Sequence, residues 1–196
     1  MKELSAFDIL TENLVDLGYK PEAYISNKNF IVPGRDRFLN RKYVICPLSD
    51  NIFFIASDSY GTSAHSSSTF TGLYSTINLQ SEIEYKVVKK NWFDFLYTKR
   101  KKSGIDYIDK KLTILSSDRI HDNKLDKQIV ELFLKLNKDD PYSLIVENDY
   151  LPHIQALKGE KIIAVETGSW IYQKDNLIRL IETGQKLIAS IKNTCG

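Results

Sequence analysis

The sequence predicts an α+β fold in which a largely antiparallel sheet carries about three helices packed mainly on one face. Apolar residues recur at helical spacing in three segments, two of them near the ends of the chain. Between the first two of these segments, up to about residue 118, short apolar runs alternate with turn residues and indicate strands. Because no long crossover separates those strands, neighbouring ones are expected to pair antiparallel.

The first helix is predicted over residues 5–17. Its apolar residues are spaced three or four apart, Ser5 with Asp8 gives a capping-type start, and Gly18 supplies a stop. The following runs "KYVICPL" and "NIFFIAS" are joined by "SDN" and predict a β-hairpin, since they are rich in β-branched and aromatic residues. Pro47 has no amide hydrogen to donate, so its strand is expected at an edge of the sheet or at a bulge.

Further strands are expected in "FTGLYSTINL", "IEYKVVKK" and "KKLTILSS". Residues 91–100, "NWFDFLYTKR", carry mixed signals and are interpreted as a strand because of their aromatic content. A second helix is predicted over residues 122–136 with Asp122 as its N-cap, followed by strands in "YSLIVEN" and "KIIAVETGSWIY". The last helix lies in "KDNLIRLIETGQKLIASIK", where Gly184 costs about 1 kcal/mol relative to alanine but lets another element pack closely.

The composition is that of a soluble globular protein, with 42% hydrophobic and 27% charged residues in a chain of 196. We interpret residues 1–196 as one α+β domain, with a possible division near residue 118. The 27 basic and 25 acidic residues leave a formal net charge of +2. A nucleic acid or an anionic surface would therefore have to be bound by a local basic patch.

A cytoplasmic location without a membrane span is expected. Cys46 and Cys195 lie far apart along the chain, which indicates neither a disulfide framework nor zinc spacing. Acidic residues interrupt the apolar part of the N-terminal segment, unlike in a signal peptide, and no 18 apolar residues run together.

A hydroxyl-rich stretch, "GTSAHSSSTFTG" at residues 61–72, invites a hydrolase interpretation in which a histidine deprotonates a serine. Neighbours in an extended chain point to opposite faces, however, and no "GxSxG" turn presents a nucleophile. We therefore interpret the stretch as a polar strand or loop whose hydroxyls face water. The residues concerned are Ser63, His65, Ser66, Ser67 and Ser68.

Asp118, His121 and Asp122 in "DRIHDN" could share one side of a helical turn and hold a divalent ion. No second cluster at ligand spacing accompanies them, so the favoured interpretation is that the two carboxylates precede and cap the next helix. His153 follows a proline and is assigned no role.

Two acidic pairs flank turns, where carboxylates are common, and they also receive a structural interpretation. These are Asp139 with Asp140 and Glu147 with Asp149. No "GxGxxG" or "GxxxxGK" loop is present to hold a nucleotide phosphate. No catalytic residue, cofactor or metal site is assigned.

The most distinctive surface feature is "KVVKKNWFDFLYTKRKKSG", where seven basic residues surround four aromatic ones with one opposing aspartate. Basic side chains beside aromatic ones can bind phosphates while stacking on bases. Alternatively, the aromatic residues alternate into the core and "KRKKSG" forms a solvated turn. The tentative binding residues are Trp92, Lys99, Arg100, Lys101 and Lys102.

The stretch "SGIDYIDKKLTILSSD", followed by a helix, a short strand and "WIYQKDNLIRLIETGQKLIASI", resembles the soluble part of various uncharacterised bacterial proteins. This resemblance covers mostly residues 103–192. It implies a bacterial type of protein and no particular activity.

The leading hypothesis is a non-enzymatic cytoplasmic protein that binds another protein, or itself, through part of its sheet or through the basic aromatic segment. One alternative is binding to nucleic acid or an anionic surface through Lys86 to Lys102. The other is a small hydrolase whose serine, histidine and aspartate groups are brought together from "GTSAHSSS" and "DRIHDN".

Overall fold

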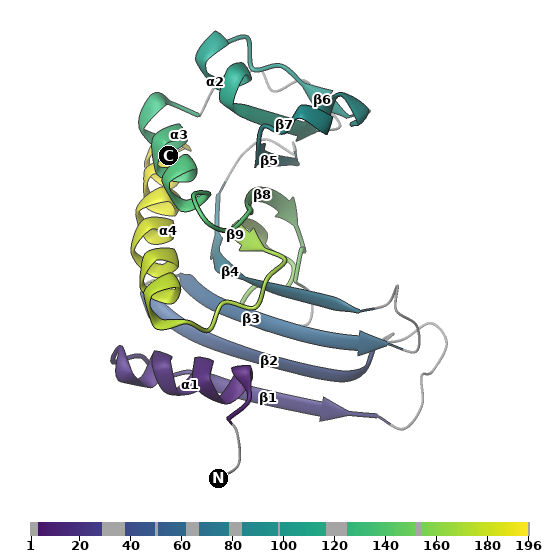
Figure 1. Cartoon of the computed structure of the whole chain (residues 1–196), viewed down its shortest axis with the longest axis vertical. Helices are drawn as coiled ribbons and strands as arrows, with labels where there is room; N and C mark the ends of the chain where they lie inside the picture. The colour runs from purple at the N-terminus through teal and green to yellow at the C-terminus, as the bar shows by residue number, and fades with distance from the viewer. Residues whose placement is uncertain are drawn as a thin grey trace.

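The computed structural model describes residues 4–28, 38–49, 51–61, 67–78, 84–97, 99–116, 125–151 and 154–195. Within these residues nine strands form one sheet in the order β1-β2-β3-β4-β9-β8-β5-β7-β6 (Figure 1). Every pair of neighbouring strands is antiparallel. The predicted α+β fold is therefore confirmed.

The sheet and its helices are made as follows. The strands are β1 (Glu22–Asn27), β2 (Phe38–Ser49), β3 (Ile52–Gly61), β4 (Ser68–Thr76), β5 (Tyr85–Lys89), β6 (Arg100–Lys101), β7 (Leu112–Ser116), β8 (Tyr142–Asn148) and β9 (Lys161–Thr167). The helices are α1 (Ala6–Asp16), α2 (Asp106–Lys111), α3 (Lys127–Leu136), α4 (Lys174–Cys195) and the 3-10 helix η2 (Trp92–Leu96).

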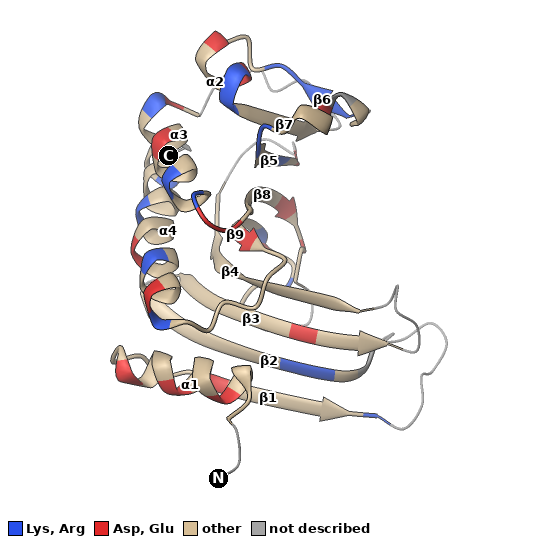
Figure 2. Cartoon of the chain, viewed as in Figure 1, with Lys and Arg blue, Asp and Glu red and all other residues tan. Residues whose placement is uncertain are grey.

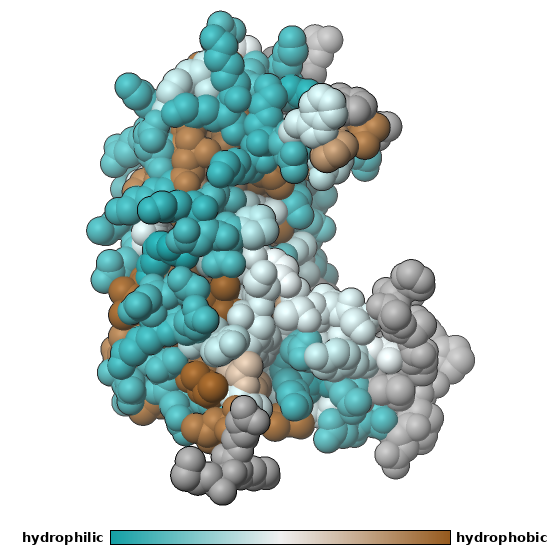
Figure 3. All heavy atoms as spheres, viewed as in Figure 1, coloured by the Kyte–Doolittle hydropathy of each residue, from teal (hydrophilic) through white to brown (hydrophobic). Residues whose placement is uncertain are grey.

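The three longer helices, α1, α3 and α4, pack on one face of the sheet, as expected (Figure 1). Alternate strand residues such as Phe54, Leu73 and Val165 point to this face and join the larger core cluster. The other face has a smaller core, which includes Ile55 and Tyr74 from the sheet and Leu151, Ile154 and Leu157 from the segment after β8. In the space-filling view the molecule is hollowed on the side away from α4 (Figure 3). We call this second side of the sheet the open face.

The local signals for α1 and for the first hairpin are confirmed. Ser5 and Asp8 form a reciprocal capping box, and Gly18 adopts a φ of +87° after the helix ends. The turn between β2 and β3 places Asn51 at a φ of 62°, a conformation that asparagine tolerates well. Serine and aspartate side chains at the start of α1 and an asparagine in the turn thus act as the sequence predicts.

Pro47 lies at a bulge, as expected, but not in an edge strand. The register of β2 against β3 shifts between Pro47 and Ser49. β2 is the second strand of the sheet because β1 pairs with it. β1 begins at Glu22, opposite Ile45, so among the described residues no strand pairs with β2 beside Pro47 on that side. Because no neighbouring strand needs a hydrogen bond from residue 47 on that side, β2 tolerates the missing amide hydrogen of Pro47 although it is not an edge strand.

The prediction of a strand over residues 91–100 is wrong, because Trp92–Leu96 form η2 instead. Asp94 is 4% exposed and accepts hydrogen bonds from the Asn91 amide, at 2.7 Å, and from the Thr113 hydroxyl. These bonds favour a tight turn over the strand that the aromatic residues favour. Among the described residues of this segment, only Arg100 belongs to a strand, the two-residue β6.

The second predicted helix begins later than expected. Asp126 is the N-cap of α3, since its Oδ1 accepts a hydrogen bond of 2.8 Å from the Ile129 amide. Asp122 itself lies outside the described residues, as does residue 118, where a domain division was considered. In the last helix, a Cβ added to Gly184 would lie 2.7 Å from Leu73 Cδ1, so β4 does pack closely against this glycine.

Candidate binding surface

The predicted basic aromatic segment forms one end of the molecule, beside the edge strand β6. We call this surface the tip. It comprises the exposed apolar side chains of η2 and its surroundings together with the basic run that follows. Trp92 is 78% exposed and Leu96 is 67% exposed. The members of the tip are Trp92, Phe93, Leu96, Tyr97, Lys99, Arg100, Lys101, Lys102 and Ile105.

Trp92, Phe93 and Tyr97 are all exposed, so the interpretation in which the aromatic residues alternate into the core is wrong for these three. The side chain of Phe95 lies outside the described part of the structure. The backbone beneath the exposed side chains is nevertheless well anchored. Buried Asp94 ties η2 to β7 through Thr113. Asp109 in α2 accepts hydrogen bonds from the amide and hydroxyl of Ser103, at 2.8 and 2.9 Å. The turn after β6 is therefore fixed, and the apolar side chains are held in water by an ordered scaffold.

The tip is also strongly basic. Residues 86–111 contain nine lysine or arginine residues and three aspartates. One of the three, Asp94, is buried and bonded within the turn, so it adds little negative charge to the surface. Lys99 and Lys102 are exposed, whereas Arg100 and Lys101 on β6 are half-buried. Figure 2 shows this basic character of the tip on β6.

All three histidines lie outside the described residues, as do Ser63, Ser66, Asp118 and Asp122. The hydrolase and the "DRIHDN" metal hypotheses therefore stay predictions. Within the described part of the chain, no group of three histidine, cysteine, aspartate or glutamate residues could hold a metal ion. Burial raises the pKa of the Cys46 thiol to about 11, so this cysteine stays protonated at neutral pH.

The acidic pairs differ in their roles. Asp139 and Asp140 both form ion pairs with Arg179 on α4, and Oδ2 of Asp140 lies 3.8 Å from Nη2 of Arg179. Asp149 accepts a hydrogen bond of 2.8 Å from the Gly159 amide within a turn, as a structural carboxylate does. Glu147 is different, because burial, followed by the charges of Glu84 and Glu166, raises its pKa.

A polar cluster on the open face was missed in the sequence. Tyr74 on β4 donates a hydrogen bond of 2.6 Å to Glu166 Oε2 on β9, and Tyr150 donates one of 3.0 Å to Oε1. Burial raises the pKa of Glu166, and the two tyrosine hydroxyls act in the opposite direction. The one signal in the sequence is a glutamate within the apolar strand "KIIAVETG", which points to the face opposite Val165.

This cluster holds strands together and has little capacity for proton transfer. Burial and the neighbouring Glu166 raise the pKa values of Tyr74 and Tyr150, so both hydroxyls stay protonated and act as donors. The bonds join β4, β9 and the segment after β8. Glu166 therefore acts as a fixed acceptor beneath two tyrosines.

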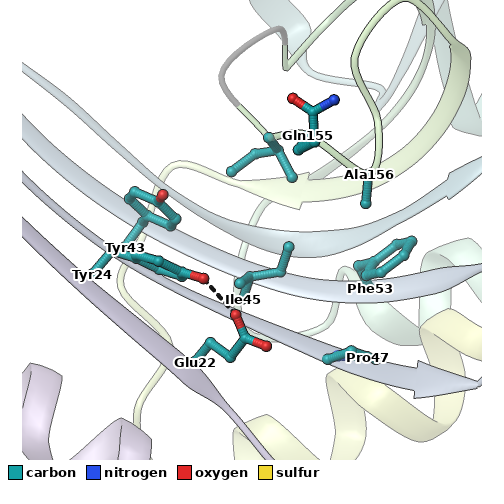
Figure 4. Close-up of a pocket in the computed structure, with 9 residues that line it drawn as sticks. Glu22, Tyr24, Tyr43, Ile45, Pro47, Phe53, Gln155 and Ala156 are labelled. Atoms are coloured by element: carbon teal, nitrogen blue, oxygen red, sulfur yellow. Dashed lines mark hydrogen bonds between the residues drawn. The ribbon is translucent and has the colours of Figure 1, made fainter.

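Two open pockets lie on the same face, and the first of them adjoins the cluster at Tyr150. One, of about 270 Å³, is lined by Lys86, Lys99, Glu147 and Tyr150 among others. The second, of about 310 Å³, lies over β1, β2 and β3 beneath the segment at Ile154–Ala156 (Figure 4). Its wall includes the stacked rings of Tyr24 and Tyr43, whose centroids are 4.6 Å apart. The Tyr24 hydroxyl donates a hydrogen bond to the carboxylate of Glu22. Both pockets are shallow hollows in the sheet surface.

No protein-family model, curated protein or solved structure matches the chain. The resemblance to uncharacterised bacterial proteins therefore stays an expectation. In the part of the chain that the structure describes, no helix combines the length and the apolar character needed to cross a bilayer.

Proposed function

We propose that this chain acts by binding rather than by catalysis, and that its tip docks onto the anionic surface of a lipid bilayer. The observation that carries this proposal is the exposure of Trp92, Phe93, Leu96 and Tyr97 shortly before four consecutive basic residues, which begin at Lys99. Exposed apolar surface costs about 25 cal/mol per Å², so an ordered apolar tip marks a surface that is covered in use. The basic run beside it selects a negatively charged partner.

The composition of the tip favours a bilayer over a nucleic acid. Leu96 and Ile105 have no aromatic face on which a base can stack, but their side chains can enter the acyl boundary of a membrane. Tryptophan and tyrosine are the residues that prefer the headgroup region. Three of the four charges in the basic run are lysines, which attract anionic headgroups without needing a fixed geometry.

The expected binding is peripheral and reversible. Each lysine or arginine near an anionic membrane contributes about 1 kcal/mol, and the apolar side chains add to this. Phosphatidylserine and phosphoinositides make the cytoplasmic leaflet negative, so the proposal agrees with the predicted cytoplasmic location. High salt should release the protein, since the Debye length shrinks to about 3 Å at 1 M.

Vesicle flotation tests the proposal. We expect the full chain to float with vesicles that contain phosphatidylserine, to stay behind with pure phosphatidylcholine, and to be released as salt rises. A fluorescent single-stranded oligonucleotide serves as the competing partner. If the chain binds the oligonucleotide and ignores both vesicles, the tip is a nucleic-acid site and the bilayer proposal is wrong. Failure to float with anionic vesicles in low salt likewise overturns it.

A further inference from the structure

The opposite end of the sheet from the tip presents a second unusual surface, at β1. β1 pairs with β2 on one side, and no described strand pairs with its other side. All six of its residues are exposed, and Ile25 is 59% exposed. The outward N–H and C=O groups of such a strand form a template for a further strand.

β1 lacks several of the features that usually protect an edge. Its sequence, "EAYISN", contains no lysine and no proline. Its pairing with β2 runs without a register shift from Glu22 to Asn27, so no bulge twists the edge away. Tyr24 and Ile25 are both exposed, and Leu4, just before α1, and Val15, on α1, are further exposed apolar side chains. α1 lies at the same end of the molecule as β1 (Figure 1). An unprotected edge of this kind is expected to be paired in use.

We propose that a second copy of this chain pairs with β1, strand to strand and antiparallel, about a two-fold axis that passes midway between Ile25 and Ile25 of the second copy. In this register Ile25 lies opposite Ile25 of the second copy, and Glu22 lies opposite Lys28 of the second copy. Two opposite-charge pairs and one apolar pair thus arise from a single self-complementary segment. A second copy of this chain always carries the charges that match Glu22 and Lys28, whereas a strand from another protein need not carry them.

The register also fits the faces of the sheet. Residues directly opposite each other in antiparallel strands point to the same side. Glu22 and Tyr24 line the pocket on the open face (Figure 4), whereas Ile25 points to the face that carries α1. Pairing about Ile25 therefore joins open face to open face and helix layer to helix layer. A shift by one residue would place Glu22 opposite Asn27, lose both charge pairs and join unlike faces.

The interface is small, because it consists mainly of one six-residue strand. Interfaces that bury less than about 1,000 Å² in total are weak, so we expect dissociation at micromolar rather than nanomolar concentrations. The proposal does not depend on the bilayer proposal, since the tip lies at the other end of the sheet. Each can therefore fail without the other.

Analytical ultracentrifugation of the full chain over a concentration series tests the dimer. We expect the wild type to shift from monomer to dimer, and Ile25→Lys to stay monomeric, because two like charges then face each other. Glu22→Lys alone and Lys28→Glu alone each create like-charge pairs and should weaken the dimer by at least about tenfold. The double variant Glu22→Lys with Lys28→Glu should restore it.

Tyr60→Lys is the matched control, since Tyr60 is an exposed aromatic residue on β3 and lies outside β1; it should leave the dimer unchanged. Circular dichroism checks that each variant is folded. The proposal is overturned if the wild type is monomeric at roughly 100 µM, well above the expected dissociation constant. It is also overturned if Ile25→Lys leaves a dimer intact or if the double variant fails to restore one.

Discussion

Replacing Lys99, Arg100, Lys101 and Lys102 together with alanine is expected to weaken binding to anionic vesicles by roughly 10²- to 10³-fold, because each charge contributes about 1 kcal/mol near the membrane. The half-burial of Arg100 and Lys101 favours the lower end of this range. β6 is held by backbone pairing to β7, so the variant should remain folded. Flotation at low salt measures the loss, and the difference from the wild type should shrink as salt rises.

The matched control for the charge variant replaces four exposed lysines outside the tip with alanine. Lys135, Lys138, Lys158 and Lys186 supply the same change in net charge. If this control loses as much affinity as the tip variant, the protein is attracted by its overall charge and the tip has no special role. A complementary variant, Trp92→Ser with Leu96→Ser, should lower binding at every salt concentration, because its contribution is apolar.

Tyr74→Phe is expected to lower the free energy of unfolding by about 1.5–3 kcal/mol at neutral pH, since it removes a hydrogen bond to an ionised carboxylate. Tyr74 is fully buried, so water cannot replace the lost donor, and Tyr150 remains as a donor to Glu166. Urea denaturation followed by circular dichroism measures the change. A loss below about 0.5 kcal/mol, the scale of a surface substitution, would show that the bond contributes little.

The pH dependence of this loss gives a second test. Burial raises the pKa of Glu166 in the folded state above its value of 4.5 in the unfolded chain. Protonated Glu166 therefore contributes stability that is fully present below pH 4.5 and is lost as the pH rises through the pKa of the folded state. Removing the Tyr74 donor raises the folded pKa further. The difference between Tyr74→Phe and wild type should therefore be smallest below pH 4.5 and should grow toward neutral pH. A constant difference would contradict this account.

Tyr142→Phe is the matched control for Tyr74→Phe. Tyr142 is also a buried strand tyrosine, but its hydroxyl has no hydrogen-bond partner among the described residues. Removing an unpaired buried hydroxyl should leave stability unchanged or increase it slightly. Equal destabilisation by the two substitutions would show that the effect arises from packing and not from the bond to Glu166.

Features that depend on neighbours in sequence could be predicted from the sequence. Each end of α1 is marked by residues within about one helical turn of it: Ser5 and Asp8 at the start, and Gly18 at the end. The hairpin of β2 and β3 likewise depends on a short turn at Asn51. The bulge at Pro47 follows from the chemistry of one residue. For the same reason, the sequence alone predicts that the basic run at residues 99–102 reaches the surface, as Lys99 and Lys102 do.

Features that depend on residues distant in sequence could not be predicted. Asp94 favours η2 because Thr113, nineteen residues later, bonds to its buried carboxylate. Tyr74 and Glu166 are 92 residues apart and meet because β4 pairs with β9 across a long crossover. Trp92 is the first residue of η2, and its side chain is exposed there. The predicted strand would instead have allowed the aromatic side chains to alternate into the core. In each case tertiary contacts decided between local alternatives that the sequence left balanced.

The most direct measurement of the central claim uses the fluorescence of Trp92. The chain contains two tryptophans, and Trp170 is half-buried against Phe7, so Trp170→Phe leaves Trp92 as the sole reporter. We predict that anionic vesicles shift its emission to shorter wavelengths and that brominated acyl chains quench it. If the emission of Trp92 stays that of a residue in water while the protein floats with anionic vesicles, the bilayer is bound elsewhere and the account of the tip is contradicted.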